Sequence, residues 1–215
     1  MPEPNSVQVV WRAFELDPSS PRVIEQTGSY AERLARKYRT SVAQADAMIR
    51  RMTNIAADDG LEFRFDRIRP GNTFDAHRLL HLAADHGTQG ALKERLLRAY
   101  LTEGAAIGDP DTLLPLACDV GLDADTVRGV LATDAYAKEV GADELMAHEL
   151  GIQGVPFFVF RERYAVSGAQ AEDVLLEVLL RAWNEDAAAD AFAEGESCGP
   201  DGCARRDVVQ PADTS

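Results

Sequence analysis

The chain has 215 residues, of which 46% are apolar and 7% aromatic, so it is long enough for one large domain with a core of its own. Its formal net charge is −14, and so acidic a surface repels phosphate backbones and anionic lipids. We therefore expect no nucleic-acid or membrane partner. Because the sequence shows no secretory leader and no apolar run long enough to span a bilayer, we expect a cytoplasmic protein.

The N-terminal third predicts two strands and, between them, two helices. Residues 7–16 (VQVVWRAFEL) are rich in β-branched and aromatic residues and are soon followed by prolines, which is typical of a strand that enters a loop. Residues 27–39 show helical spacing, and Ser41 with Gln44 predicts a capping box at the start of a second helix. Residues 61–65 (LEFRF) alternate and predict a short strand.

The middle of the chain has a helical pattern throughout. The candidate helices span residues 73–85, 89–103, 110–120, 124–132 and 135–149. So many consecutive helices do not fit inside a small sheet, and we expect them to form a layer of their own.

The strand pattern returns near the C-terminus. Residues 157–160 and 164–167 predict the two strands of a hairpin, and residues 169–183 predict an amphipathic helix. Residues 186–215 are acidic and rich in Ala, Gly and Pro, and we expect a flexible tail there. This order of elements indicates an α/β frame with an inserted all-α domain.

Four stretches of the chain together carry a family signature. They are VVWRAFELDP at 9–18, NTFDAHRLLHLA at 72–83, RAYLTEGAAIGD at 98–109 and GIQGVPFFVFRERYAVSGAQ at 151–170. They resemble the FrnE-like branch of the DsbA family of thiol–disulfide oxidoreductases, and the resemblance covers most of the chain. It implies an enzyme with a thioredoxin-like fold and a helical insertion. Its partners would be protein or small-molecule thiols and disulfides.

On this resemblance the thioredoxin-like domain is discontinuous, at residues 1–70 and 151–185, with the helical insertion at 71–150 and the tail at 186–215. The family carries a C-x-x-C at the N-terminus of its first helix, where the helix dipole lowers the pKa of the thiol. In this chain no two cysteines are separated by two residues. We therefore expect the first strand and the active-site helix to be absent.

Two explanations of this expected absence stay open. The reading frame could begin upstream of Met1, which we favour because the rest of the pattern is intact. Alternatively, the chain is a degenerate family member that is inactive as given.

Val155 and Pro156 are the predicted substrate-docking residues. A proline cannot donate to a strand ladder, so Pro156 belongs at the start of the hairpin strand. The resemblance implies a cis bond before Pro156, which leaves the backbone of Val155 free for an extended substrate. An ordinary trans proline is the alternative, since cis X-Pro bonds are scarce. The resemblance also implies that Asn72, Thr73 and His77 line the substrate cleft.

Cys198 and Cys203 flank a Gly-Pro-Asp-Gly turn, which could bring their Cα atoms within disulfide range. A disulfide across so short a loop would stabilise the fold little, which favours exchange over a structural role. The resemblance implies an auxiliary catalytic pair that passes electrons to or from the main site, and idle exposed thiols are the alternative. Cys118 is expected to be a buried, inert thiol.

No metal site is predicted. The tail supplies two cysteines without a histidine, and His77 and His81, four residues apart, lack an evident third ligand. No cofactor is predicted, with glutathione as the one candidate. Two other functions stay open: a glutathione-dependent isomerase similar to 2-hydroxychromene-2-carboxylate isomerase, and a non-catalytic, chaperone-like peptide binder.

Overall fold

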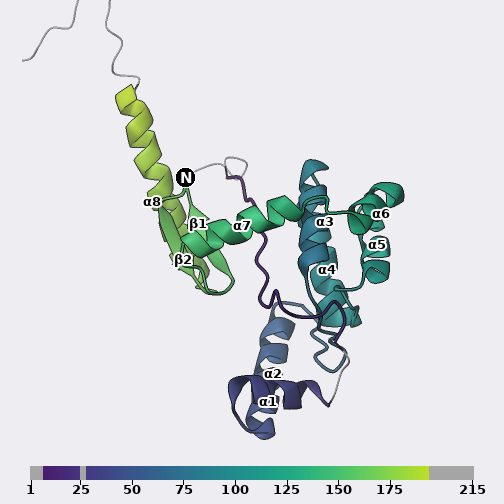
Figure 1. The fold of residues 1–215 in the computed structure, drawn as a ribbon. Helices are drawn as coiled ribbons and strands as arrows, with labels where there is room; N and C mark the ends of the chain where they lie inside the picture. Colours follow the sequence, from purple (N-terminus) through teal and green to yellow (C-terminus); the bar gives the residue numbers. More distant parts are fainter. Residues whose placement is uncertain (1–6, 25–27, 194–215) are drawn as a thin grey trace, which may run out of the picture. The chain divides into compact units, whose positions relative to one another are not determined.

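The computed structural model describes residues 7–24 and 28–193, with side chains up to residue 185 (Figure 1). The protein divides into two compact units. Val9–Val155 form the first, here called the helical unit, and Pro156–Ser215 with Met1–Gln8 form the second, here called the hairpin unit. The domain boundaries expected from the sequence stay a prediction.

The helices expected in the first two thirds of the chain are all present in the helical unit. They are α1 (Tyr30–Tyr38), α2 (Val42–Asp58), α3 (Phe74–Asp85), α4 (Gln89–Arg98), α5 (Pro110–Cys118), α6 (Ala124–Ala132) and α7 (Ala137–Glu149). The helix predicted over residues 89–103 ends in a π-helical turn, η2 (Ala99–Glu103), and Gly104 then takes a left-handed conformation with φ of 76°. Only glycine adopts that conformation at no steric cost.

Local sequence explains where α1 and α2 begin. The Ser41 hydroxyl accepts a hydrogen bond from the Gln44 N–H, and the Gln44 side chain accepts one from the Ser41 N–H, which confirms the predicted capping box. Ser29 and Glu32 form the same reciprocal arrangement at the start of α1. Each box satisfies backbone donors that the first turn of a helix leaves without a partner.

The helical unit contains two hydrophobic clusters. The larger joins α3 to α6 and is centred on side chains that are fully or almost fully buried, among them Leu79, Leu82, Leu92, Leu113 and Val127. The smaller lies between α1 and α2 and consists of Ala31, Ala35 and Ala45, with Leu34 and Ile49 packed against it. Burial of this apolar area is the main force that stabilises the helices in water.

Two predicted strands are wrong. Residues 7–16 are not a strand, and their backbone N–H groups at Ala13 and Glu15 donate to side chains of α7. Residues 61–65 are not a strand either, because the Leu61 N–H bonds back to Ala56 and the Arg64 N–H bonds to Leu101. A β-rich composition becomes a strand only where a neighbouring strand supplies the ladder.

The hairpin unit confirms the two predicted C-terminal strands. β1 (Phe157–Phe160) and β2 (Tyr164–Ser167) pair antiparallel, with Phe157 opposite Ser167 and Phe160 opposite Tyr164. In the turn between them, Arg161 and Glu162 both take left-handed φ values, of 52° and 56°. The final helix, α8 (Glu172–Ala193), packs against both strands.

α8 continues past residue 183, where the sequence analysis ended it. Residues 184–193 (NEDAAADAFA) include five alanines, the strongest helix former, which explains the extension. The rest of the predicted tail, residues 194–215, lies outside the described residues. Within the described part of the chain, no helix has the length and apolar character needed to cross a bilayer.

Candidate functional site

A concentrated group of polar contacts surrounds Asp143 of α7, which is only 4% exposed. Its Oδ2 atom accepts a hydrogen bond of 2.8 Å from the Ala13 N–H and lies 3.1 Å from Nε2 of His81 on α3. Its Oδ1 atom accepts a hydrogen bond of 3.1 Å from Nη1 of Arg12. Two hydrogen bonds and the contact with His81 thus surround one buried carboxylate and join residues 9–16 to α3 and α7.

Glu144, the next residue of α7, extends this arrangement. Its Oε1 atom accepts a hydrogen bond of 3.3 Å from the Glu15 N–H. Burial raises the pKa of the Glu15 carboxyl, and the hydrogen bond from Asn72 opposes that shift. The carboxyl of Glu15, which faces this acidic neighbour, is therefore harder to ionise than an ordinary glutamate because its pKa is raised.

Asn72, a predicted cleft residue, is engaged on both ends of its amide. Its Nδ2 group donates to Oε2 of Glu15 over 2.9 Å and to the Pro18 carbonyl over 3.3 Å. Its Oδ1 atom accepts a hydrogen bond of 2.8 Å from the Phe74 N–H, at the first residue of α3. These bonds fix the loop before α3, so Asn72 has a structural role in the helical unit.

Thr73 and His77 lie at the start of α3. The Thr73 carbonyl accepts a hydrogen bond of 3.0 Å from the His77 N–H, which is the first turn of that helix. Burial lowers the pKa of His77, while the negative charge of Glu144 and a hydrogen bond to the backbone of Phe14 oppose the shift. The neutral imidazole is therefore favoured in the folded protein.

His77 and His81 share one face of α3, as their spacing predicted. The carboxylate that meets His81 comes from Asp143 on α7, which the sequence analysis did not consider as a partner. Asp85, one turn further along α3, accepts a hydrogen bond of 2.7 Å from the Tyr136 hydroxyl. Among the described residues, no three ligating side chains are arranged to hold a metal ion.

A second buried polar group surrounds Arg78, also on α3. Its Nη1 atom lies 2.8 Å from Oδ1 of Asp75, and its Nε group donates over 2.8 Å to the Ala135 carbonyl. Its Nη2 group donates to the carbonyls of Val130 and Thr133. Arg78 therefore satisfies backbone acceptors where α6 ends and the chain turns toward α7.

The predicted docking residues lie where the two units meet in sequence. Val155, the last residue of the helical unit, is 52% exposed. Pro156 opens the hairpin unit, and its carbonyl accepts a hydrogen bond of 2.9 Å from the Gly168 N–H, just beyond β2. Pro156 is thus at the start of a strand, where a residue without an N–H is expected. A cleft shared by these residues and Asn72, Thr73 and His77 stays a prediction.

Of the three cysteines, Cys118 ends α5 and is partly exposed, so the expectation that it is buried is wrong. The helix stops there and the chain turns through Gly121, which leaves the last residue of α5 incompletely covered. Cys198 and Cys203 lie outside the described residues.

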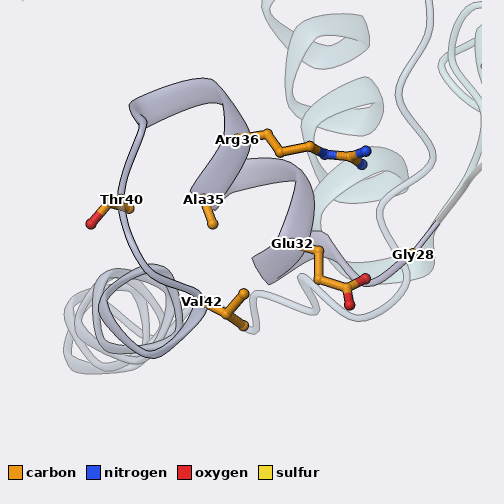
Figure 2. A pocket seen from close by; sticks show the side chains of 6 residues that line it. All are labelled: Gly28, Glu32, Ala35, Arg36, Thr40 and Val42. Atoms are coloured by element: carbon orange, nitrogen blue, oxygen red, sulfur yellow. The ribbon is translucent and has the colours of Figure 1, made fainter.

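One open pocket of about 580 Å³ lies beside α1 and the start of α2 (Figure 2). It is lined by Gly28, Glu32, Ala35, Arg36, Thr40 and Val42. Figure 2 shows the Glu32 side chain directed toward Gly28, and its carboxylate accepts the 2.7 Å hydrogen bond of the α1 capping box. The lining contains no cysteine or histidine and none of the predicted site residues, so the pocket offers no group for thiol chemistry.

The sequence analysis missed Asp143 and Arg78, although a signal was available for each. Asp143 falls on the buried stripe of α7 with Val140 and Ala147. Arg78 falls on the buried stripe of α3, three residues after Asp75. Charged residues at apolar positions of a helical repeat are rarely buried unless they are paired, so their spacing predicts a buried polar contact.

Comparison with known proteins gives consistent matches. Residues 2–180 match the family model of the DSBA-like thioredoxin domain. The uncharacterized protein YwbO of Bacillus subtilis (strain 168) is 28% identical over 171 residues, which is 78% of this chain and 78% of that protein. The solved structure of a probable DsbA oxidoreductase, SCO1869 of Streptomyces coelicolor, is 40% identical with a TM-score of 0.77, over 94% of this chain and 86% of that chain.

Proposed function

Because the chain belongs to the DSBA-like thioredoxin-domain family, we propose that it is an oxidoreductase that exchanges thiols and disulfides. Its fold is the DsbA-like thioredoxin fold in a mostly helical form with a small two-stranded sheet. The observation that carries the proposal is the 40% identity to the probable DsbA oxidoreductase over 94% of this chain. At the finer level, the four sequence stretches support a place in the FrnE-like branch.

In the proposed function, Val155 and Pro156 dock the substrate. The half-exposed side chain of Val155 and the strand-opening position of Pro156 support this role. Pro156 has no N–H and cannot donate a hydrogen bond to a neighbouring strand. An extended substrate would therefore pair with the backbone of Val155, the residue before it.

The proposed chemistry uses the Cys198 and Cys203 pair as an auxiliary redox centre. A thiolate of the pair attacks one sulfur of a substrate disulfide, which forms a mixed disulfide and releases the other sulfur as a thiolate that takes up a proton. The second thiolate of the pair then attacks the mixed disulfide. This step closes the Cys198–Cys203 disulfide and releases the second substrate thiol, so two electrons pass to the substrate. The reverse sequence oxidises a dithiol.

The experiment is an exchange assay on the full chain with oxidised glutathione and, separately, with a disulfide-bonded protein. We expect the double variant Cys198→Ser/Cys203→Ser to lose most of the exchange. The matched control is Cys118→Ser, which removes a thiol outside the pair and is expected to keep the wild-type rate. Pro156→Thr is expected to slow exchange with the protein substrate more than with glutathione.

A wild-type chain that exchanges no faster than the double variant would reject the redox role of the pair. Isomerisation of a chromene carboxylate without any disulfide exchange would select the isomerase in place of the oxidoreductase.

A further inference from the structure

Residues 11–15, here called the latch segment, are held in place by contacts with side chains. The Ala13 N–H donates to Oδ2 of Asp143 over 2.8 Å. The Glu15 N–H donates to Oε1 of Glu144 over 3.3 Å. Within the described part of the chain, no backbone–backbone hydrogen bond joins this segment to another one. Its attachment therefore depends on the charges of the ionisable side chains around it.

His77 of α3 touches the latch segment. Its side chain is partly buried and is hydrogen-bonded to the backbone of Phe14. Burial lowers the pKa of His77, because an imidazolium in this position loses part of its hydration. Since Phe14 belongs to the latch segment, this segment supplies part of the cover over the imidazole.

The charged and titratable groups around His77 come from three elements. They are Asp143 and Glu144 on α7, His81 on α3, and Arg12 and Glu15 on the latch segment. The two α7 carboxylates favour an imidazolium at His77 and His81 opposes it, but burial has the largest effect. A proton on His77 therefore costs more free energy under the latch segment than in contact with water.

From these contacts we propose that the latch segment detaches from α3 and α7 when His77 takes up a proton. Detachment returns water to the imidazolium. The opening is local, because no residue of the latch segment belongs to the hydrophobic cluster that joins α3 to α6. It involves no cysteine and does not rest on the proposed redox function.

Glu15 adds a pH dependence of the opposite sign. Burial raises the pKa of Glu15, so its contribution to attachment is complete below pH 4.5 and is lost as the pH rises through the raised value. The contribution of His77 is complete above pH 6.5 and is lost as the pH falls through the lowered value. When the pH falls from neutrality, a detached His77 takes up its proton first, so we expect the wild-type segment to open.

The test is amide hydrogen exchange of the full chain at pH 7.5 and pH 5.5, followed by NMR and corrected for the intrinsic pH dependence of exchange. The Ala13 and Glu15 amides report the latch segment, and the amides of the buried residues Leu79 and Leu82 report the core of the helical unit. We expect the protection of Ala13 and Glu15 to fall at pH 5.5, by at most about tenfold per pH unit for one proton. The core amides should keep their protection.

Three variants assign the effect. In His77→Asn, where Glu15 still titrates, the protection of Ala13 should rise between pH 7.5 and pH 5.5. In Glu15→Gln the wild-type loss of protection should become larger, because the opposing group is gone. The matched control is His86→Asn, which removes an exposed histidine at the end of α3 and should behave as the wild type does.

A measurement on the wild type alone keeps the test independent of how the variants fold. An NMR titration of the His77 ring should give a pKa below 6.5, and the protection of Ala13 should change over the same pH range. A change at a different pH would overturn the proposal, as would equal protection of Ala13 at pH 7.5 and pH 5.5. A loss that His77→Asn leaves unchanged would assign it to another group. If Leu79 and Leu82 lost protection together with Ala13, acid would be opening the whole helical unit, which would reject a local latch.

Discussion

Nε2 of His81 lies 3.1 Å from Oδ2 of Asp143, which joins α3 to α7 through two side chains 62 residues apart in sequence. The same oxygen accepts the Ala13 N–H at 2.8 Å. The position of residues 12 and 13 and the orientation of His81 therefore depend on one carboxylate.

Asp143→Asn tests that dependence. The amide keeps the size of the side chain but replaces one acceptor oxygen with a donor, which then faces the Ala13, Arg12 or His81 donors. We expect the free energy of unfolding to fall by about 1–3 kcal/mol, as for a buried polar group left without its partner. Urea unfolding measures the change. Glu149→Gln, an exposed acid on the same helix, is the control and should leave the midpoint near the wild-type value.

His77 gives the stability a defined pH dependence. Burial lowers its pKa below the ordinary value of 6.5, so the unfolded chain binds the proton more readily than the folded protein does. Stability from this group is complete above pH 6.5 and falls as the pH drops toward the lowered pKa. Urea unfolding at a series of pH values should show this slope in the wild type and a smaller slope in His77→Asn. His86 is an exposed histidine and serves as the control. If the slope persisted in His77→Asn and vanished in His86→Asn, the assignment of the pH dependence to His77 would be wrong.

Replacement of Arg78 by a smaller side chain, or by a base of another shape, is expected to lower the free energy of unfolding. Arg78→Ala would leave the buried Asp75 carboxylate with Arg22 as its one ion-pair partner among the described residues. It would also remove the donor from the carbonyls at the end of α6. We expect a loss of about 3–5 kcal/mol, as when one partner of a buried ion pair is removed. Arg78→Lys should restore only part of this, because an ammonium lacks the planar fork. Arg98→Ala, on an exposed side chain, is the control for thermal and urea unfolding.

The phenol of Tyr136 is expected to ionise at a higher pH than an ordinary tyrosine. The hydrogen bond from its hydroxyl to Asp85 raises the pKa of Tyr136 to about 12. The contact therefore stabilises the fold fully below pH 10 and is lost as the pH rises through the raised value. Ultraviolet absorbance titration should show one phenol that ionises near pH 12 in the wild type and moves toward 10 in Asp85→Asn. If Tyr136→Phe leaves the late-titrating phenol in place, the assignment is wrong.

The helices and the hairpin could be predicted because local signals agree with their final environment. Ser41 and Gln44 mark the start of α2, and Pro156 with the β-rich residues 157–160 marks β1. Residues 7–16 have an equally strong strand composition, yet they bind the carboxylates of Asp143 and Glu144. Composition reports a preference for extended backbone, whereas the partner of that backbone is set by distant residues.

The candidate site was harder to predict than the fold. His77 and His81 were found by their spacing on one helix, but their acidic neighbours come from α7, more than 60 residues later. A single sequence does not report which two helices will face each other. Asn72 shows the converse difficulty, because a polar residue at the start of a helix predicts a cap as readily as a cleft residue.

Arg78 also has a consequence for how the helical unit loses its structure. One guanidinium holds acceptors on α3, at the end of α6 and in the turn before α7. If one of these segments frayed alone, the guanidinium of Arg78 would lose acceptors while it was still buried in an apolar interior. The opening of one segment at a time is therefore costly. The three segments should therefore exchange their amide hydrogens as a single cooperative block, with protection that rises and falls together.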